Sequence, residues 1–173
     1  LLNFYTNYYL NTEDYPGAIG IFQQMLEIET LRADIRLRTH RSLGQLYASE
    51  EDWQGSIDNY EQWRILSDTE DEIVYRGLSY AHYQLENFEE AKPFWIARME
   101  LLLDAGETLE REDYAYLNGL YFTLEDFESA LDLTKTMIVL YDNQTDWQNL
   151  SAIYAGLEND DRGLQALNLY YLR

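Results

Sequence analysis

The stretch from Arg41 to Tyr60, RSLGQLYASEEDWQGSIDNY, decides the fold class. It contains two apolar runs separated by an acidic turn at residues 50–52, and each run has the spacing of an amphipathic helix. The stretch therefore predicts two helices joined by a short turn. The residues that carry this pattern are Leu43, Gly44 and Tyr47 in the first helix, Trp53 at the turn, and Ser56 and Tyr60 in the second helix.

The same pattern recurs along the chain. In five places a stretch ending in aromatics is followed by an acidic turn and then by a small residue that begins a second apolar run. These small residues are separated by 38, 35, 39 and 33 positions, which brackets a repeat period of about 34. A repeat of this length predicts an all-α chain of stacked helix pairs. The small residues are Ala18, Ser56, Ala91, Ala130 and Gly163.

Residues 41–60 resemble a tetratricopeptide repeat (TPR), and four further stretches share parts of that pattern. The resemblance covers essentially the whole chain and implies an all-α, right-handed α-solenoid of about five TPR-like helix-turn-helix repeats. Trp63, Arg98 and Tyr170 stand where the family prefers a small residue, which implies a locally wider groove. The other four copies are carried by Tyr9, Tyr15, Ala18 and Phe22; by Leu85, Phe88, Ala91 and Trp95; by Leu117, Tyr121, Leu124, Phe127 and Ala130; and by Trp147, Leu150, Ser151 and Tyr154.

The resemblance implies one solenoid domain over residues 1–173, with repeats at about 1–30, 31–68, 69–107, 108–142 and 143–173. We expect first helices near 1–11, 31–49, 69–86, 109–124 and 144–158. Second helices are expected near 15–28, 53–66, 88–104, 127–141 and 161–172. Because the chain opens at Leu1 without an initiator Met, we interpret it as a fragment of a longer protein.

Small residues and prolines refine this map. Two helices of one repeat approach to about 8–10 Å only if small side chains lie at the crossing, so Gly44 and Ala91 act as spacers. Pro93 falls in the second turn of an expected helix, where it removes a backbone donor and should distort the helix. Helix-start signals are Pro16, Asp52, Asn87 with Glu90, Asp126 and Asp160.

Composition excludes several classes of site. The absence of cysteine excludes disulfides, thiol nucleophiles and cysteine-ligated zinc. The net charge of -20 repels phosphates, so we expect no nucleic-acid binding. The longest apolar run, at residues 137–141, is far shorter than a membrane span, so we expect no direct membrane insertion.

Catalytic and metal-binding patterns are also missing. His40 and His82 are the only candidate imidazole bases, and they fall on different expected helices without a nucleophile signature beside them. The acidic clusters at residues 50–52 and 68–72, and the alternating polar residues at 142–146, lack the glycine that a calcium loop needs. We therefore expect no enzymatic activity and no catalytic, cofactor-binding or metal site.

The first helices of TPR proteins line a concave groove that binds proteins or peptides. A peptide carboxylate could be held by Arg41 and Arg76, because guanidinium groups bind carboxylates in a bidentate fork. Tyr80 and Tyr83 would then cover the apolar part of the peptide. Arg32, Arg36, Arg38 and Arg41 crowd the start of one expected helix. The alternative is that these arginines pair with Glu27, Glu29 and Asp34 and only keep the helix soluble. The groove positions carried over from the family are Asn3, Asn7, Arg38, Arg41, Gln45, Arg76, Tyr80, Tyr83, Ala115, Gly119, Phe122, Gln148 and Ala152.

The final stretch, LYDNQTDWQNLSAIYAGLENDDRGLQALNLYYLR from Leu140, looks like the last repeats of periplasmic TPR proteins associated with TonB energy-transduction systems of Gram-negative bacteria. This resemblance implies a periplasmic adaptor that assists iron uptake through protein contacts, with the cytoplasm as the alternative location. We expect a non-enzymatic scaffold that binds a protein or peptide partner. The alternative is a structural subunit that docks through its convex face or its end repeats. The sequence does not predict the oligomeric state.

Overall fold

The computed structural model describes residues 14–172. Every regular element in that range is an α-helix, which confirms the all-α prediction. The expected helix at 1–11, with Asn3 and Asn7, lies outside the described residues. The helices are α2 (Tyr15–Leu26), α3 (Ala33–Ser49), α4 (Trp53–Leu66), α5 (Glu72–Gln84), α6 (Phe88–Asp104), α7 (Arg111–Thr123), α8 (Phe127–Tyr141), α9 (Gln144–Gly156) and α10 (Asp160–Tyr171).

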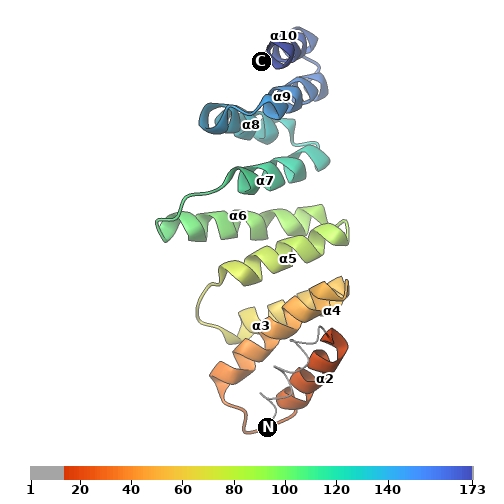
Figure 1. Ribbon diagram of the computed structural model, residues 1–173, viewed down its shortest axis with the longest axis vertical. Coiled ribbons are helices and arrows are strands. Elements are labelled where there is room, and N and C mark those ends of the chain that lie inside the picture. The colour runs from red at the N-terminus through yellow and green to blue at the C-terminus, as the bar shows by residue number, and fades with distance from the viewer. Residues whose placement is uncertain (1–13, 173) are drawn as a thin grey trace. The chain divides into compact units, whose positions relative to one another are not determined.

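The chain divides into two compact units, unit 1 from Leu1 to Leu101 and unit 2 from Leu102 to Arg173. In unit 1 the helices α2, α3, α4 and α5 pack one against the next, and in unit 2 the same holds for α7, α8, α9 and α10 (Figure 1). First and second helices therefore alternate in each unit as the repeats predict. The placement of one domain over residues 1–173 stays a prediction.

The second helices begin and end close to where the sequence places them. The bounds of α4, α6 and α8 coincide with the expected 53–66, 88–104 and 127–141. Asp52 caps α4 by accepting a hydrogen bond from the Gly55 amide at 2.9 Å, and Asp126 caps α8 in the same way. The expected cap at Asp160 is wrong. Asn159 accepts the capping hydrogen bond of α10, and Asp160 is the first residue of the helix.

The turns inside the repeats share one backbone conformation. A glutamate with a positive φ, between 54° and 61°, closes each of the four described first helices. After α3, the Glu51 amide donates to Ala48 and the Asp52 amide donates to Tyr47, which satisfies carbonyls at the helix end. A short acidic turn of this form reverses the chain into the second helix. The four glutamates are Glu51, Glu86, Glu125 and Glu158.

Hydroxyl groups join the two helices of a repeat at the predicted crossing. Ser56 Oγ on α4 donates to the carbonyl of Gly44 on α3 at 2.8 Å. Ser79 Oγ on α5 donates to the carbonyl of Ala91 on α6 at 2.9 Å, and Ser151 forms the same bond to Gly163. Each bond joins residues twelve positions apart, and the same pair of repeat positions forms it in three repeats.

Helix α6 contains Pro93 and Arg98, two residues that depart from the repeat pattern, and the structure shows where each lies. Pro93 does not interrupt the helix, which is continuous from Phe88 to Asp104. Pro93 lacks the amide hydrogen that would bond to the Glu89 carbonyl, and both residues are exposed. Arg98 is buried, and its Nε donates to Glu72 Oε1 at 2.8 Å while its guanidinium lies 4.7 Å from the centre of the Trp95 ring. The large Arg98 side chain on α6 is therefore buried and bound to α5.

Candidate protein-binding surface

The predicted groove residues of unit 1 lie on two neighbouring first helices, α3 and α5. These helices contact each other directly as well as through α4. All six residues have solvent-accessible side chains, and Tyr80 is 45% exposed. We call this surface the α3/α5 face. It consists of Arg38, Arg41 and Gln45 on α3 and of Arg76, Tyr80 and Tyr83 on α5.

Arg41 already has a structural partner. Its Nε lies 3.3 Å from Oδ2 of Asp71, the residue that precedes α5. The other oxygen of Asp71 accepts hydrogen bonds from the amides of Ile73 and Val74 and so caps α5. Arg41 therefore ties α3 to the start of α5. It contributes positive charge to the α3/α5 face, but its guanidinium is held in place by the fold.

Arg38 and Arg76 are held more weakly. Arg76 lies 4.0 Å from Glu72, a carboxylate that Arg98 approaches to 2.8 Å. Arg38 lies 3.8 Å from Asp34, which Arg32 approaches to 3.0 Å. The side chains of Arg38 and Arg76 are also 81% and 52% exposed. These two guanidinium groups can therefore take a new carboxylate at little cost to the existing contacts.

The alternative that the arginines pair with nearby carboxylates holds for Arg32 and Arg38, which both pair with Asp34, but Arg36 pairs with neither Glu27 nor Glu29. Arg36 donates to the backbone carbonyls of Leu26 and Ile28, each at 3.2 Å. These carbonyls lie at and just beyond the C-terminal end of α2, where helical donors are missing and a positive charge is favoured. Arg36 is therefore a capping residue rather than a member of a surface ion pair.

A buried tyrosine lies between α3 and α5. The ring of Tyr60, from α4, contacts Gly44 and Gly77, because a Cβ atom on either glycine would come within 2.7 Å of it. Burial raises the pKa of Tyr60 to about 12, and the positive charges of Arg76 and Arg41 oppose this shift. The hydroxyl is therefore protonated at neutral pH, and the two arginines act electrostatically on the same buried group.

The exposed tyrosines are held by ring contacts. Tyr80 meets Trp53 edge to face, with ring centres 5.6 Å apart, and Tyr83 meets Phe88 at 5.2 Å in the same geometry. Trp53 and Phe88 are the residues that begin the second helices α4 and α6. Each tyrosine therefore presents a ring to solvent in a restricted orientation, which lowers the entropy lost when a partner covers it.

The remaining predicted site residues belong to unit 2. Phe122 on α7 is 45% exposed and meets Phe127 edge to face at 5.5 Å, and Gln148 on α9 is exposed. Phe127 also contacts Gly156, where a Cβ atom would come within 2.7 Å of its ring. Sequence reasoning missed this use of Phe127 as a support. The signal that could have revealed it is the aromatic residue three positions before the small residue in four of the repeats.

Both histidines have packing roles. His82 stacks on Phe94 with ring centres 5.7 Å apart, and burial lowers its pKa. His40 Nδ1 lies 3.1 Å from the side-chain oxygen of Asn59. Among residues 14–172, no group of three acidic, histidine or cysteine side chains is placed to hold a metal ion. No helix in the same range has the length and apolarity needed to cross a membrane.

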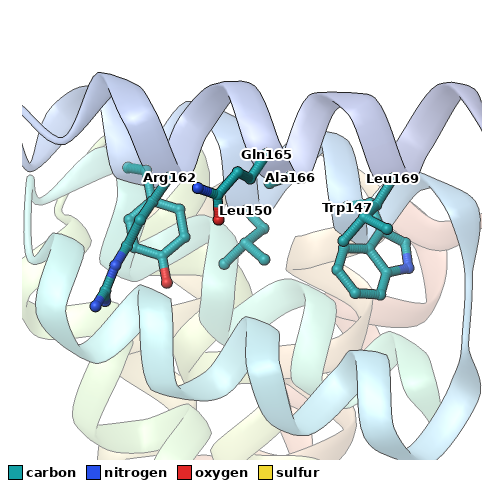
Figure 2. A pocket seen from close by; sticks show the side chains of 7 residues that line it. Trp147, Leu150, Arg162, Gln165, Ala166 and Leu169 are labelled. Carbon is teal, nitrogen blue, oxygen red and sulfur yellow. The ribbon is translucent and has the colours of Figure 1, made fainter.

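Figure 2 shows a pocket of unit 2 between α9 and α10, where Arg162, Gln165 and Leu169 extend from α10 toward the side chains of α9. Its volume is about 210 Å³. Binding sites for small molecules usually exceed 300 Å³, so the pocket is a packing gap rather than a cofactor site. The Arg162 guanidinium lies 5.9 Å from the centre of the Tyr154 ring and closes one side.

Comparison with solved structures shows the fold. The crystal structure of MamA protein is 18% identical and covers 98% of this chain and 87% of its own, with a TM-score of 0.74. YrrB, described as a TPR protein with an unusual peptide-binding site, is 17% identical over 95% of this chain and 80% of its own, with a TM-score of 0.73. BtubC (BKLC) from P. vanneervenii is 16% identical over 98% of this chain and 77% of its own, with a TM-score of 0.66. No family model and no curated protein matches the sequence.

Proposed function

We propose that this chain, which has the fold of TPR proteins, is a non-enzymatic scaffold that binds a peptide segment of a partner protein on the α3/α5 face. The observation that carries the proposal is the pair of exposed but ring-supported tyrosines, Tyr80 and Tyr83, on the helix that also carries Arg76. Aromatic and arginine side chains are the residue types that dominate binding energy at protein interfaces. The peptide-binding site named in the description of YrrB is consistent with this use of the fold.

The side chains of the α3/α5 face indicate which residues a bound peptide would carry. Arg76 and Arg38 would bind its carboxylates, because both are exposed and weakly paired. Aliphatic or aromatic side chains would cover Tyr80 and Tyr83. Arg41 adds attraction at longer range without leaving Asp71. The preferred segment therefore combines acidic residues with an apolar anchor.

A display selection from a random peptide library tests this proposal. Selected peptides should contain acidic and apolar positions, and Arg76→Glu should weaken their binding about tenfold or more because a charge-assisted hydrogen bond is replaced by repulsion. Tyr80→Ala should weaken the same peptides. Lys135→Glu makes the same charge change on α8 in unit 2, with its side chain 49% exposed, and serves as the control. Equal binding by Arg76→Glu and Lys135→Glu would refute the α3/α5 face as the site.

We further propose a periplasmic location and a partner in a TonB-type envelope transport system, on the resemblance of the stretch from Leu140 to Arg173 alone. Cell fractionation of the full-length protein tests the location. Cross-linking in intact cells tests the partner, because a TonB-system component should be recovered from wild type and lost with Arg76→Glu. Recovery of the protein in the cytoplasmic fraction would refute this part of the proposal and leave the peptide-binding proposal standing.

A further inference from the structure

Helix α6 brings a buried arginine against the helix that carries Arg76. Arg98 is 8% exposed, and its Nε donates a hydrogen bond to Oε1 of Glu72, the first residue of α5, at 2.8 Å. The Arg98 guanidinium also lies 4.7 Å from the centre of the buried Trp95 ring on its own helix. An ion pair and an aromatic ring therefore hold Arg98 in place.

This ion pair replaces an uncharged contact of the repeat. Glu72 and Arg98 are 26 residues apart, and the same two repeat positions meet in unit 2, where Gln144 donates to the carbonyl of Tyr170 at 2.9 Å. Arg98 lies seven residues after the small residue of its repeat, and the other repeats have an uncharged residue there. Those residues are Met25, Trp63, Met137 and Tyr170.

Stability alone does not account for the charge of Arg98. Removing two charges from water costs about as much as their attraction returns, so an apolar pair of similar size is often equally stable. Met25 and Met137 are 6% and 1% exposed at the corresponding positions, which shows that the fold accepts an uncharged side chain there. The charge of Arg98 therefore indicates a role other than packing.

Arg98 and Arg76 share one carboxylate oxygen. Arg76 follows Glu72 by one turn of α5, the i,i+4 spacing at which glutamate and arginine commonly pair. Its Nη1 nevertheless lies 4.0 Å from Oε1 of Glu72, the oxygen that accepts the hydrogen bond from Arg98. Because Arg98 neutralises Glu72, the three side chains together carry a net positive charge, and the guanidinium of Arg76 stays 52% exposed.

We propose that Arg98 is a positioning residue that makes the α3/α5 face select acidic peptides. It acts through Glu72, which it keeps from forming a closed pair with Arg76. Glu72 still limits where the Arg76 guanidinium can lie, which lowers the entropy lost when a carboxylate binds it. All three residues belong to unit 1. The role of Arg98 rests on the proposed peptide-binding function and adds the source of its preference for acidic segments.

A first measurement needs no peptide. Glu72→Gln, Arg76→Gln and the double variant are compared by urea unfolding, in the wild-type chain and again with Arg98→Met. The coupling between Glu72 and Arg76 should change the unfolding equilibrium constant by less than about twofold in wild type and by about threefold with Arg98→Met. Met is the substitute because Met25 and Met137 occupy the same repeat position. Equal coupling in the two backgrounds would overturn the proposal.

The second measurement uses the peptides from the display selection as probes. Each acidic peptide is paired with a copy in which glutamine and asparagine replace glutamate and aspartate. Arg98→Met should weaken the acidic peptide about fivefold and change the uncharged copy by less than about twofold. Arg98→Lys should keep most of the affinity, because it keeps a charge beside Glu72. Arg98→Met with Glu72→Gln should restore the affinity, because Arg76 then has no competing carboxylate on α5.

Arg64→Met is the matched control. It removes the same charge from unit 1, but Arg64 pairs with Glu61 on α4 at 2.7 Å, outside the α3/α5 face. It should leave the acidic peptide unchanged. Equal weakening by Arg64→Met and Arg98→Met would reveal an effect of net charge alone and would contradict the role of Arg98. Equal weakening of the acidic peptide and its uncharged copy by Arg98→Met would contradict it as well, because it would indicate lost packing.

The remaining outcomes separate the role of Arg98 from the function on which it rests. If Arg76→Glu weakens the acidic peptide and Arg98→Met does not, the α3/α5 face binds peptides and the role of Arg98 is wrong. If no peptide binds, or Arg76→Glu has no effect, the proposed function is wrong and the role of Arg98 fails with it, whatever the coupling between Glu72 and Arg76.

Discussion

Gly77→Ala should destabilise unit 1 by about 1–2 kcal/mol. A Cβ atom at Gly77 would lie 2.3 Å from Cε2 of Tyr60, whereas ordinary contacts begin near 3.4 Å, so the ring or α5 must shift by about 1 Å. The ring cannot retreat toward α3, because it already lies against Gly44. Overpacking of this kind costs about 1–3 kcal/mol, and alanine's better helix propensity returns up to about 1 kcal/mol.

Gly119→Ala is the matched control. Gly119 also lies inside a first helix, but no atom lies within 4 Å of the position that its Cβ would take. The same chemical change should therefore stabilise the protein by about 0.5–1 kcal/mol. Urea unfolding followed by circular dichroism measures both variants, with unchanged denaturant slopes as the condition for comparing midpoints.

A second background tests the cause of the Gly77→Ala effect. If the Tyr60 ring is the obstacle, Gly77→Ala should become neutral or stabilising when it is combined with Tyr60→Leu. Shifts of Gly77→Ala and Gly119→Ala in the same direction and by the same amount would refute the argument, because they would show that the ring imposes no restriction at Gly77.

Three further predictions concern single groups. Asp71→Ala should cost about 1 kcal/mol or more, because it removes the cap of α5 together with the partner of Arg41, and Arg41→Ala should cost less; urea unfolding measures both losses. Glu125→Gly should stabilise unit 2 by up to about 1 kcal/mol, since glycine adopts the positive φ of 57° without strain, and a higher unfolding temperature would show it. The free energy of unfolding should fall as pH rises from 10 through about 12, because the folded state holds the Tyr60 proton more tightly than the unfolded state. Unfolding measurements across that pH range should show a smaller loss for Tyr60→Phe.

Much of the fold follows from local pattern in the sequence. The expected bounds of α4, α6 and α8 match the structure, because a capping or turn residue, an apolar run and a small crossing residue all lie within one repeat. Ends that depend on a more distant partner are less well predicted. The helix expected at 69–86 spans 72–84, because Asp71, which also binds Arg41, caps its start.

That the groove residues bind a partner stays a prediction, but their exposure and contacts can be compared with the sequence. The family positions correctly indicated solvent-accessible side chains, including Arg76, Tyr80 and Phe122. The sequence did not reveal that Arg41 is engaged by Asp71 or that Arg36 caps α2. Both contacts depend on how one helix lies against another, and several carboxylates and carbonyls compete for each guanidinium until that packing is defined.

The sequence by itself determined that this protein is a stack of helix pairs, because the repeat period and the small crossing residues allow helices to pack in only one recurring way. Only the tertiary structure decided which charged and aromatic side chains remain available to a partner. Burial and ion pairing depend on residues that the stacking brings together from different repeats. The sequence indicated Arg41 and Arg76 alike as candidate contacts, and only the packing of the helices showed that Arg41 is engaged by Asp71 while Arg76 is weakly paired.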